Sequence, residues 1–324
     1  MSRDINHLKI SQELGGVAIP GRHVGFGGFK QVRTLDELRS HAPSRLPDIE
    51  FTDSDNRVIV KAFEAVRDGL SPDSVLIDPA RSAQFVKLCR ELGLKHHPSV
   101  IRRRLLRMRK QSGGSPFKKT TTSFRGDNLQ EKYGPAVEYA LVRTRARYGA
   151  TVDDILIDED IAKAFEHLSK AILPGGTRKD YRLTALQIRK ARRIGDKFTR
   201  TLFDETNGLE VLNIAEPVGN WSSNIWKSSP SSPGILVAIE RQRPLYVWHT
   251  KNISHNLEYL TEAKLFDRIG EINHFFKPDT KNLQLSVIED ENLDDIPSHV
   301  AQLRIIKDTK PLLNLPVATR NSAA

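Results

Sequence analysis

The stretch SVLIDPARSAQFVKLCRELGL (74–94) decides how the first two-thirds of the chain fold, because its pattern occurs twice. At an offset of 80, the chain reads DILIDEDIAKAFEHLSKAIL (154–173), with an aspartate and the main apolar residues at matching positions. The same offset carries Met108-Arg109-Lys110 onto Ile188-Arg189-Lys190 without a gap. Agreement at one offset over about 35 residues predicts two copies of one small helical module.

Each module is predicted to contain three helices. In the first copy, the first helix is expected at 58–69 and the third at 99–111, while the second begins beside Asp78. An aspartate there accepts hydrogen bonds from free amides of the first turn, and Pro79 suits the first helical position because it has no donor to leave unsatisfied. The matching helices of the second copy are expected at 135–149, from Asp158 onward and at 179–203.

The C-terminal part has a different pattern. GILVAIERQRPLYVWHT (234–250) predicts two apolar strands joined by a short polar turn. A helix is expected at 253–273, a third strand at LQLSVIE (283–289) and a last helix at 296–316, ending in a proline-bounded turn. The predicted order is therefore strand, strand, helix, strand, helix.

Together these patterns predict an α+β protein, in which tandem helical modules precede a small domain with a three-stranded antiparallel sheet flanked by helices. A length of 324 residues suits two or three domains. The predicted divisions are a basic, glycine-containing segment (1–55), the first copy (56–112), a linker (113–134), the second copy (135–205), a linker (206–233), the C-terminal domain (234–316) and a tail (317–324).

Positive charge is concentrated in the N-terminal two-thirds of the chain. Residues 1–233 contain 39 Lys and Arg against 28 Asp and Glu, whereas residues 234–316 contain 10 against 12. A polyanionic partner is therefore expected to bind the helical modules, because the C-terminal domain offers it no net attraction.

The third helix of each module is expected to carry this interaction, since basic residues are dense there in both copies. Such a helix can lie along phosphates or enter a major groove; alternatively, it is a solvated face whose arginine stems cover the core. The candidate nucleic-acid-binding residues are Arg102, Arg103, Arg104, Arg107, Arg109, Lys110, Arg182, Arg189, Lys190, Arg192 and Arg193.

The composition indicates an intracellular protein that does not enter a membrane. Hydrophobic residues make up 38% of the chain and charged residues 28%, as in globular proteins. The sequence has no apolar run of the roughly 18 to 20 residues that a membrane span needs. The single cysteine, Cys89, cannot form an internal disulfide. A cytoplasmic location is expected.

The C-terminal domain resembles the GIY-YIG nuclease superfamily over about residues 231–318 in the order of its elements and in its motif spacing. Gly234-Ile235-Leu236 corresponds to the GIY triplet, and after nine intervening residues Tyr246-Val247-Trp248 corresponds to YIG. Asn256 stands where the family has a catalytic arginine. Gln302, twelve residues before an asparagine, stands where it has a metal-binding glutamate.

Most catalytic side chains of the family are replaced in this chain. The resemblance implies that the first tyrosine helps to activate the attacking group, and Leu236 cannot accept a proton. Asn256 offers a neutral amide instead of a guanidinium, and Gln302 lacks the charge of a carboxylate ligand. Tyr246 is retained, and His249 lies where some members carry a polar group. This degenerate cleft is expected to have no catalytic residue, metal or cofactor.

Three functions remain open at this stage. The preferred one is a nucleic-acid-binding protein, with double-stranded DNA as the expected partner, whose degenerate domain serves binding or contact with another protein. The enzyme alternative is a DNA endonuclease of restriction or mobile-element type, using Mg²⁺, Tyr246, His249 and a relocated carboxylate. The third is a scaffold whose basic helices meet an acidic protein.

Overall fold

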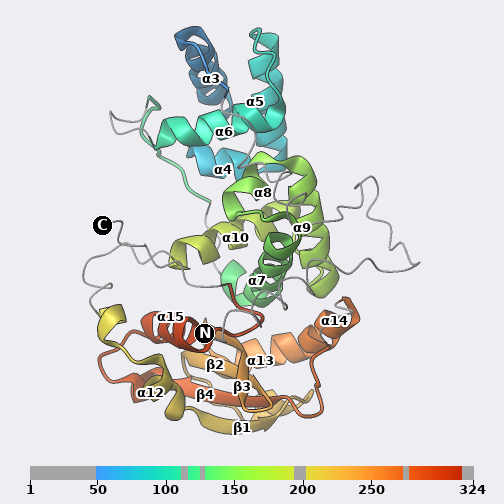
Figure 1. The fold of residues 1–324 in the computed structure, drawn as a ribbon, viewed down its shortest axis with the longest axis vertical. Coiled ribbons are helices and arrows are strands. Elements are labelled where there is room, and N and C mark those ends of the chain that lie inside the picture. Colours follow the sequence, from blue (N-terminus) through green and yellow to red (C-terminus); the bar gives the residue numbers. More distant parts are fainter. Residues whose placement is uncertain (1–48, 111–115, 125–127, 193–201, 273–276, 316–324) are drawn as a thin grey trace, which may run out of the picture. The chain divides into compact units, whose positions relative to one another are not determined.

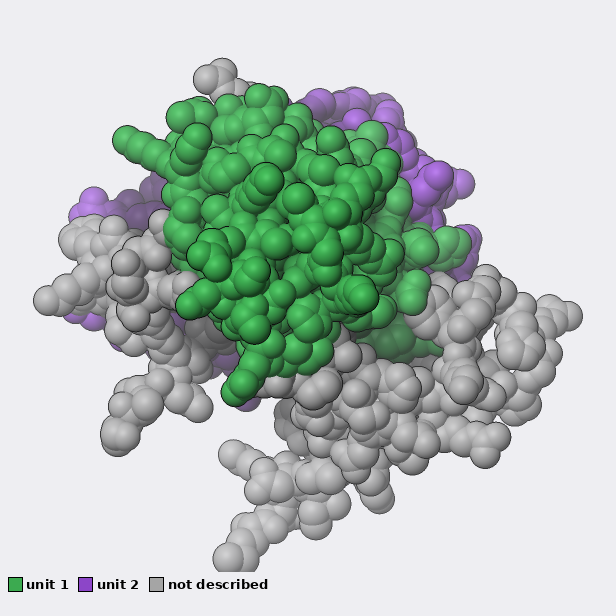
Figure 2. Space-filling model, turned by 90° about the horizontal axis from the view of Figure 1, so that it is seen from above, with its two compact units in different colours: residues 1–126, 143–168, 176–183 green, residues 127–142, 169–175, 184–324 purple. Residues whose placement is uncertain are grey.

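The computed structural model describes residues 49–110, 116–124, 128–192, 202–272 and 277–315 (Figure 1). The chain divides into two compact units, coloured green and purple in Figure 2. Unit 1 comprises Met1–Gly126, Arg143–Leu168 and Gly176–Leu183, and unit 2 comprises Asp127–Val142, Ser169–Gly175 and Thr184–Ala324. Helices and an antiparallel sheet are both present, which confirms the mixed helix-and-sheet class.

The first copy of the repeat forms four helices, not the three expected. They are α3 (Asp53–Val66), α4 (Pro72–Ile77), α5 (Pro79–Glu91) and α6 (Pro98–Arg109). Asp78 separates α4 from α5 because its backbone is extended, with φ −80° and ψ 111°. Its carboxylate accepts hydrogen bonds from the backbone N–H groups of Ala80 and Arg81, so the predicted cap of α5 is confirmed.

The second copy forms α7 (Leu129–Tyr148), α8 (Val152–Ile157), α9 (Glu159–Ile172) and α10 (Arg178–Arg192). Adding 80 to the first residue numbers of α4, α5 and α6 gives the first residues of α8, α9 and α10. Asp158 accepts hydrogen bonds from the backbone N–H groups of Asp160 and Ile161, as Asp78 does in the first copy.

The sheet of unit 2 has four strands where three were expected. They are β1 (Glu216–Asn220), β2 (Gly234–Glu240), β3 (Arg243–Thr250) and β4 (Gln284–Glu289). The strand order is β1-β4-β2-β3, and every neighbouring pair is antiparallel. The additional strand β1 comes from the segment 206–233 that the sequence predicts as a linker, and it pairs with β4.

Helices α13 (Ile253–Glu262) and α14 (Leu265–Ile272) connect β3 to β4, and α15 (Ser298–Thr309) follows β4. A short helix, α12 (Gly208–Asn213), packs together with α15. A β-carbon at Gly208 would lie 2.6 Å from the backbone of Arg304, so this close approach needs a glycine. Val237, Val247 and Ile305 belong to the core between the sheet and these two helices.

Candidate nucleic-acid interface

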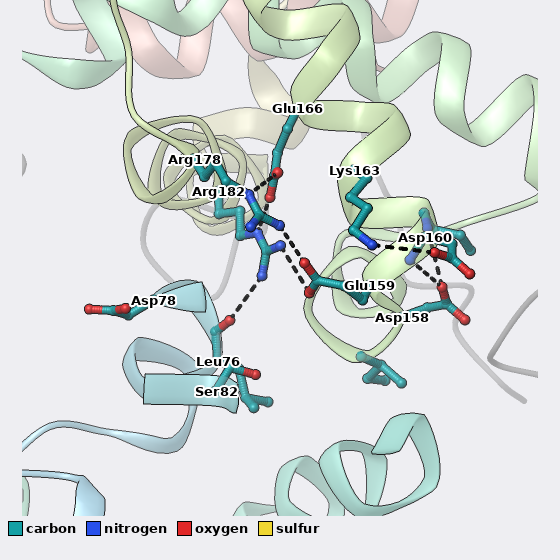
Figure 3. Close-up of polar contacts among 12 residues, drawn as sticks. Leu76, Asp78, Ser82, Asp158, Glu159, Asp160, Lys163, Glu166, Arg178 and Arg182 are labelled. Carbon is teal, nitrogen blue, oxygen red and sulfur yellow. Dashed lines mark hydrogen bonds and ion pairs between the residues drawn. The ribbon is translucent and has the colours of Figure 1, made fainter. Parts of the chain in front are cut away.

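Among the buried arginines of the repeat, Arg102 and Arg182 each donate a hydrogen bond to the other copy. Arg102 donates its Nε–H to Ser82 Oγ at 3.0 Å and an Nη1–H to the carbonyl oxygen of Ile157, in α8, at 3.2 Å. Arg182, its equivalent 80 residues later, donates to the carbonyl oxygen of Leu76, in α4, at 3.5 Å (Figure 3). Equivalent arginines of the two copies therefore donate hydrogen bonds to the opposite copy within unit 1, at acceptor positions that differ by one residue.

Carboxylates of α9 neutralise the buried guanidinium of Arg182. Figure 3 shows Arg178 and Arg182 pointing toward Glu159 and Glu166. Arg182 contacts both carboxylates and is only 1% exposed, while Arg178 contacts the same pair from a more exposed position. These arginines hold the helices of unit 1 together, because a buried charge is stable only when it is paired.

The other candidate nucleic-acid-binding residues differ in how much of their side chain is exposed. Arg103 and Arg192 are buried, Arg109 contacts Asp73, and Arg189 is half-buried. Arg107, Lys110 and Lys190 are exposed, and Arg104 is half-buried. Arg193 lies outside the described residues.

Arg104 lies in a groove of about 700 Å³ within unit 1, formed by α3, α6 and Pro116. Arg57 and Lys61, both exposed, line it as well. Sequence reasoning missed these two, although their spacing of four residues places them on one helical face. Among the described residues that line the groove, three side chains are cationic and one, Asp53, is anionic.

The guanidinium of Arg104 is oriented by its neighbours. Its Nε–H donates to Asn56 Oδ1 at 2.8 Å, and its Cζ lies 5.4 Å from the centroid of the Phe51 ring. The Phe51 ring in turn lies 4.7 Å from the His96 ring. Arg104 therefore reaches the groove without having to order its side chain on binding.

Residues 116–124 add further positive charge to unit 1. Arg67 donates to the carbonyl oxygens of Lys118, at 2.5 Å, and Lys119, at 2.9 Å, which leaves both lysine side chains exposed. Gly69 accepts backbone hydrogen bonds from the same segment and has φ +75°. A β-carbon there would lie 2.3 Å from Thr121 Oγ1, so this position needs a glycine.

In unit 2, the residues that the sequence predicts to line a degenerate cleft are largely buried. Leu236 is 0%, Tyr246 3% and Asn256 4% exposed. Leu236 lies opposite Trp248 in the β2–β3 pair, and the Tyr246 and Trp248 rings stack at 5.0 Å. The structure therefore brings these side chains together, but as packed residues and not as the lining of an open cleft.

Helix α7 supplies carboxylates to this cluster. Tyr246 donates its hydroxyl to Glu138 Oε2 at 3.0 Å, and the other oxygen of Glu138 accepts from Arg192 and from the backbone N–H of Leu315. Burial and the adjacent Glu138 carboxylate raise the pKa of Tyr246 well above its usual value. Arg192 is thus committed to an internal ion pair.

The backbone carbonyl of Glu131 accepts a hydrogen bond from a side chain of another helix. Pro135 lies inside α7 and has no N–H to donate to the carbonyl four residues before it. Asn256 supplies that donor, with its Nδ2 3.0 Å from Glu131 O, and accepts from Trp248 Nε1 at 2.7 Å. The Glu131 carboxylate also accepts from Thr250 Oγ1 at 2.6 Å. The Asn256 and Trp248 side chains therefore fix α7 onto the sheet.

Gln302 lies at the edge of β3. Its Nε2 donates to the carbonyl of Val247 at 3.2 Å, and Asn314 bonds to both the carbonyl and the N–H of Val247. A pocket of about 30 Å³ beside Gln302 is also lined by Glu138 and Arg192. This volume admits about one water molecule but no phosphodiester.

The last predicted position, His249, is half-buried on β3. Burial is the main cause that lowers its pKa, and the carboxylates of Asp290 and Glu131 partly oppose this effect. Among the described residues, no group of three or more His, Cys, Asp or Glu side chains could hold a metal ion. In the same part of the chain, no helix is long and apolar enough to cross a membrane.

Comparisons with protein-family models, with curated proteins and with solved structures found no match to this chain.

Proposed function

We propose that this protein binds nucleic acid through the groove of unit 1 and that its C-terminal domain is a structural relative of a nuclease without catalytic activity. The observation that carries the proposal is the set of three cationic side chains, Arg57, Lys61 and Arg104, that line one groove. Lys118 and Lys119, exposed on the same unit, add two further positive charges to it. Phosphate contacts by such side chains release counterions, which supplies sequence-independent affinity.

The surroundings of Tyr246 support the absence of catalysis. Its hydroxyl donates to Glu138, which is itself paired with Arg192, so this carboxylate is not free to act as a base. A relocated carboxylate is thus present, as the endonuclease alternative requires, but the adjoining pocket is too small for a scissile phosphate. We therefore favour binding over cleavage.

The test is a titration of the full chain with fluorescent DNA over a range of salt concentrations. The double substitution Arg57→Gln and Lys61→Gln should weaken binding and make the salt dependence shallower by roughly two released counterions. The matched control removes two exposed cations of unit 2, with Lys170→Gln and Arg241→Gln, and should leave binding nearly unchanged.

The same preparation should leave supercoiled plasmid intact in the presence of Mg²⁺. Equal loss of affinity in the control variant would mean that net charge, and not this groove, attracts DNA. Cleavage that disappears in Tyr246→Phe would overturn the view of the C-terminal domain as inactive.

A further inference from the structure

We propose that the groove of unit 1 binds single-stranded nucleic acid, with an unpaired base on its floor and phosphates at its cationic rim. This inference rests on the proposed nucleic-acid function and specifies its substrate class. It departs from the duplex expected from the sequence, because the groove contains more than positive charge.

The floor of the groove is suited to the face of a base. Pro116, which is exposed, and Val60, which is half-buried, contribute apolar surface to it, whereas Met108 is only 3% exposed. The groove is open to solvent along much of its volume of about 700 Å³, so a base would lie against its floor without being enclosed. A duplex keeps its bases stacked inside and presents phosphates outward, so it would leave this apolar surface uncovered. A single strand can turn a base onto it.

The polar groups of the groove are of two kinds. Arg57, Lys61 and Arg104 suit phosphate oxygens, as charge complementarity requires. Asp53 does not, because a carboxylate repels a phosphate. An exposed carboxylate can instead accept hydrogen bonds from the amino groups of a base. The Asp53 carboxylate takes no part in the capping box of α3, which is formed by Thr52 and Asp55.

Arg104 extends the site toward an aromatic surface. Its guanidinium lies over the Phe51 ring, and guanidinium planes also stack on bases. A base placed against Arg104 would continue the series formed by His96, Phe51 and Arg104. Stacking of this kind tolerates any sequence, so we expect weak sequence preference.

Substitution of Asp53 distinguishes recognition of bases from recognition of phosphates alone. The first predicts weaker binding of the single strand, and the second predicts tighter binding. The probes are a labelled single strand of about 15 nucleotides, its duplex and an abasic strand of the same length, each titrated into the full chain. The native chain should bind the single strand at least about fivefold more tightly than the abasic strand, because each stacked base adds affinity. Asp53→Ala should weaken binding of the single strand and strengthen binding of the abasic strand.

Asp160→Ala is the matched control, since Asp160 is an exposed acidic residue in the first turn of α9. It should leave the difference between the two strands unchanged. If Asp53→Ala tightens binding of all three probes, the groove recognises phosphates alone, and the inference about bases is wrong while nucleic-acid binding stands. If none of the probes binds, both proposals are wrong.

Discussion

Arginines that look alike in the sequence have different functions in the structure. Arg102 and Arg182 recur at the same position of the repeat because each donates to a carbonyl of the other copy. Arg104, which lines the groove, corresponds to Thr184 in the second copy. For this pair the recurrence therefore reflects packing between the copies, while Lys110 and Lys190 recur as exposed residues and Arg104 lies at a position that does not recur.

These assignments depend on contacts that are distant in the sequence. Arg182 and its partner Leu76 are 106 residues apart, and no local pattern predicts that pairing. The charge partition does predict that a basic surface lies in the N-terminal part, and Arg104 was among the predicted residues. Arg57 was missed because the predicted first helix begins after it, and Lys61 because the candidate contacts were sought on the third helix of each module.

Replacement of Arg182 by methionine should destabilise the chain strongly. Arg182→Met leaves the carboxylate of Glu166, which is 6% exposed, without its buried partner, and loss of one partner of a buried pair costs about 3–5 kcal/mol. Urea unfolding measures this loss. Arg178→Met is the control, because Arg178 contacts the same carboxylates but its side chain is 47% exposed, and its cost should be much smaller. Equal effects would contradict the structural role of Arg182.

Strands and helices with strong apolar patterns were predicted well, whereas weak ones were missed. Strands β2, β3 and β4 lie where apolar runs predict them. Strand β1 was missed because Pro217 and Gly219 disfavour a strand locally, and its pairing with β4 supplies the stability that its sequence does not. Helix α4 was missed because it has only six residues, too few for a helical period to be recognised.

Helix α7 offers a test of how an internal proline is accommodated. Asn256→Ala should cost about 1–3 kcal/mol, because the partly buried carbonyl of Glu131 loses its donor. In a Pro135→Ala background the cost should be smaller, since the new backbone N–H can donate to the same carbonyl. Urea unfolding of the four chains gives the coupling between the two positions.

We expect Asn256→Ala to cost about 1 kcal/mol less in the Pro135→Ala background than in the native chain. Part of the cost of Asn256→Ala should persist in both backgrounds, because Trp248 Nε1 also loses its acceptor. Asn207→Ala, which removes the N-cap of α12, is the control and should be additive with Pro135→Ala. Additivity of Asn256→Ala with Pro135→Ala would refute the account of Pro135.

At the scale of the whole molecule, the division into units does not follow the repeat. The boundary between the units falls within α7, α9 and α10, so residues of the second copy belong to both. The sequence predicts the copies from apolar spacing, but it cannot predict that Glu131 and Glu138 bond to residues of the C-terminal domain. The side chains of Tyr246, Trp248 and Asn256 thus connect α7 to the sheet, directly or through one another.

His249 should make the stability of the whole chain sensitive to mild acid. Burial lowers its pKa below the value of about 6.5 in the unfolded chain, although Asp290 and Glu131 oppose that shift. The unfolded chain therefore takes up a proton more readily, so the contribution of neutral His249 is present above about pH 6.5 and is lost as the pH falls toward the folded pKa. The free energy of unfolding should decrease between about pH 7.5 and about pH 5.5, and less so in His249→Gln. His255→Gln, at an exposed position, should keep the native pH dependence; an unchanged slope in His249→Gln would assign that dependence to other groups.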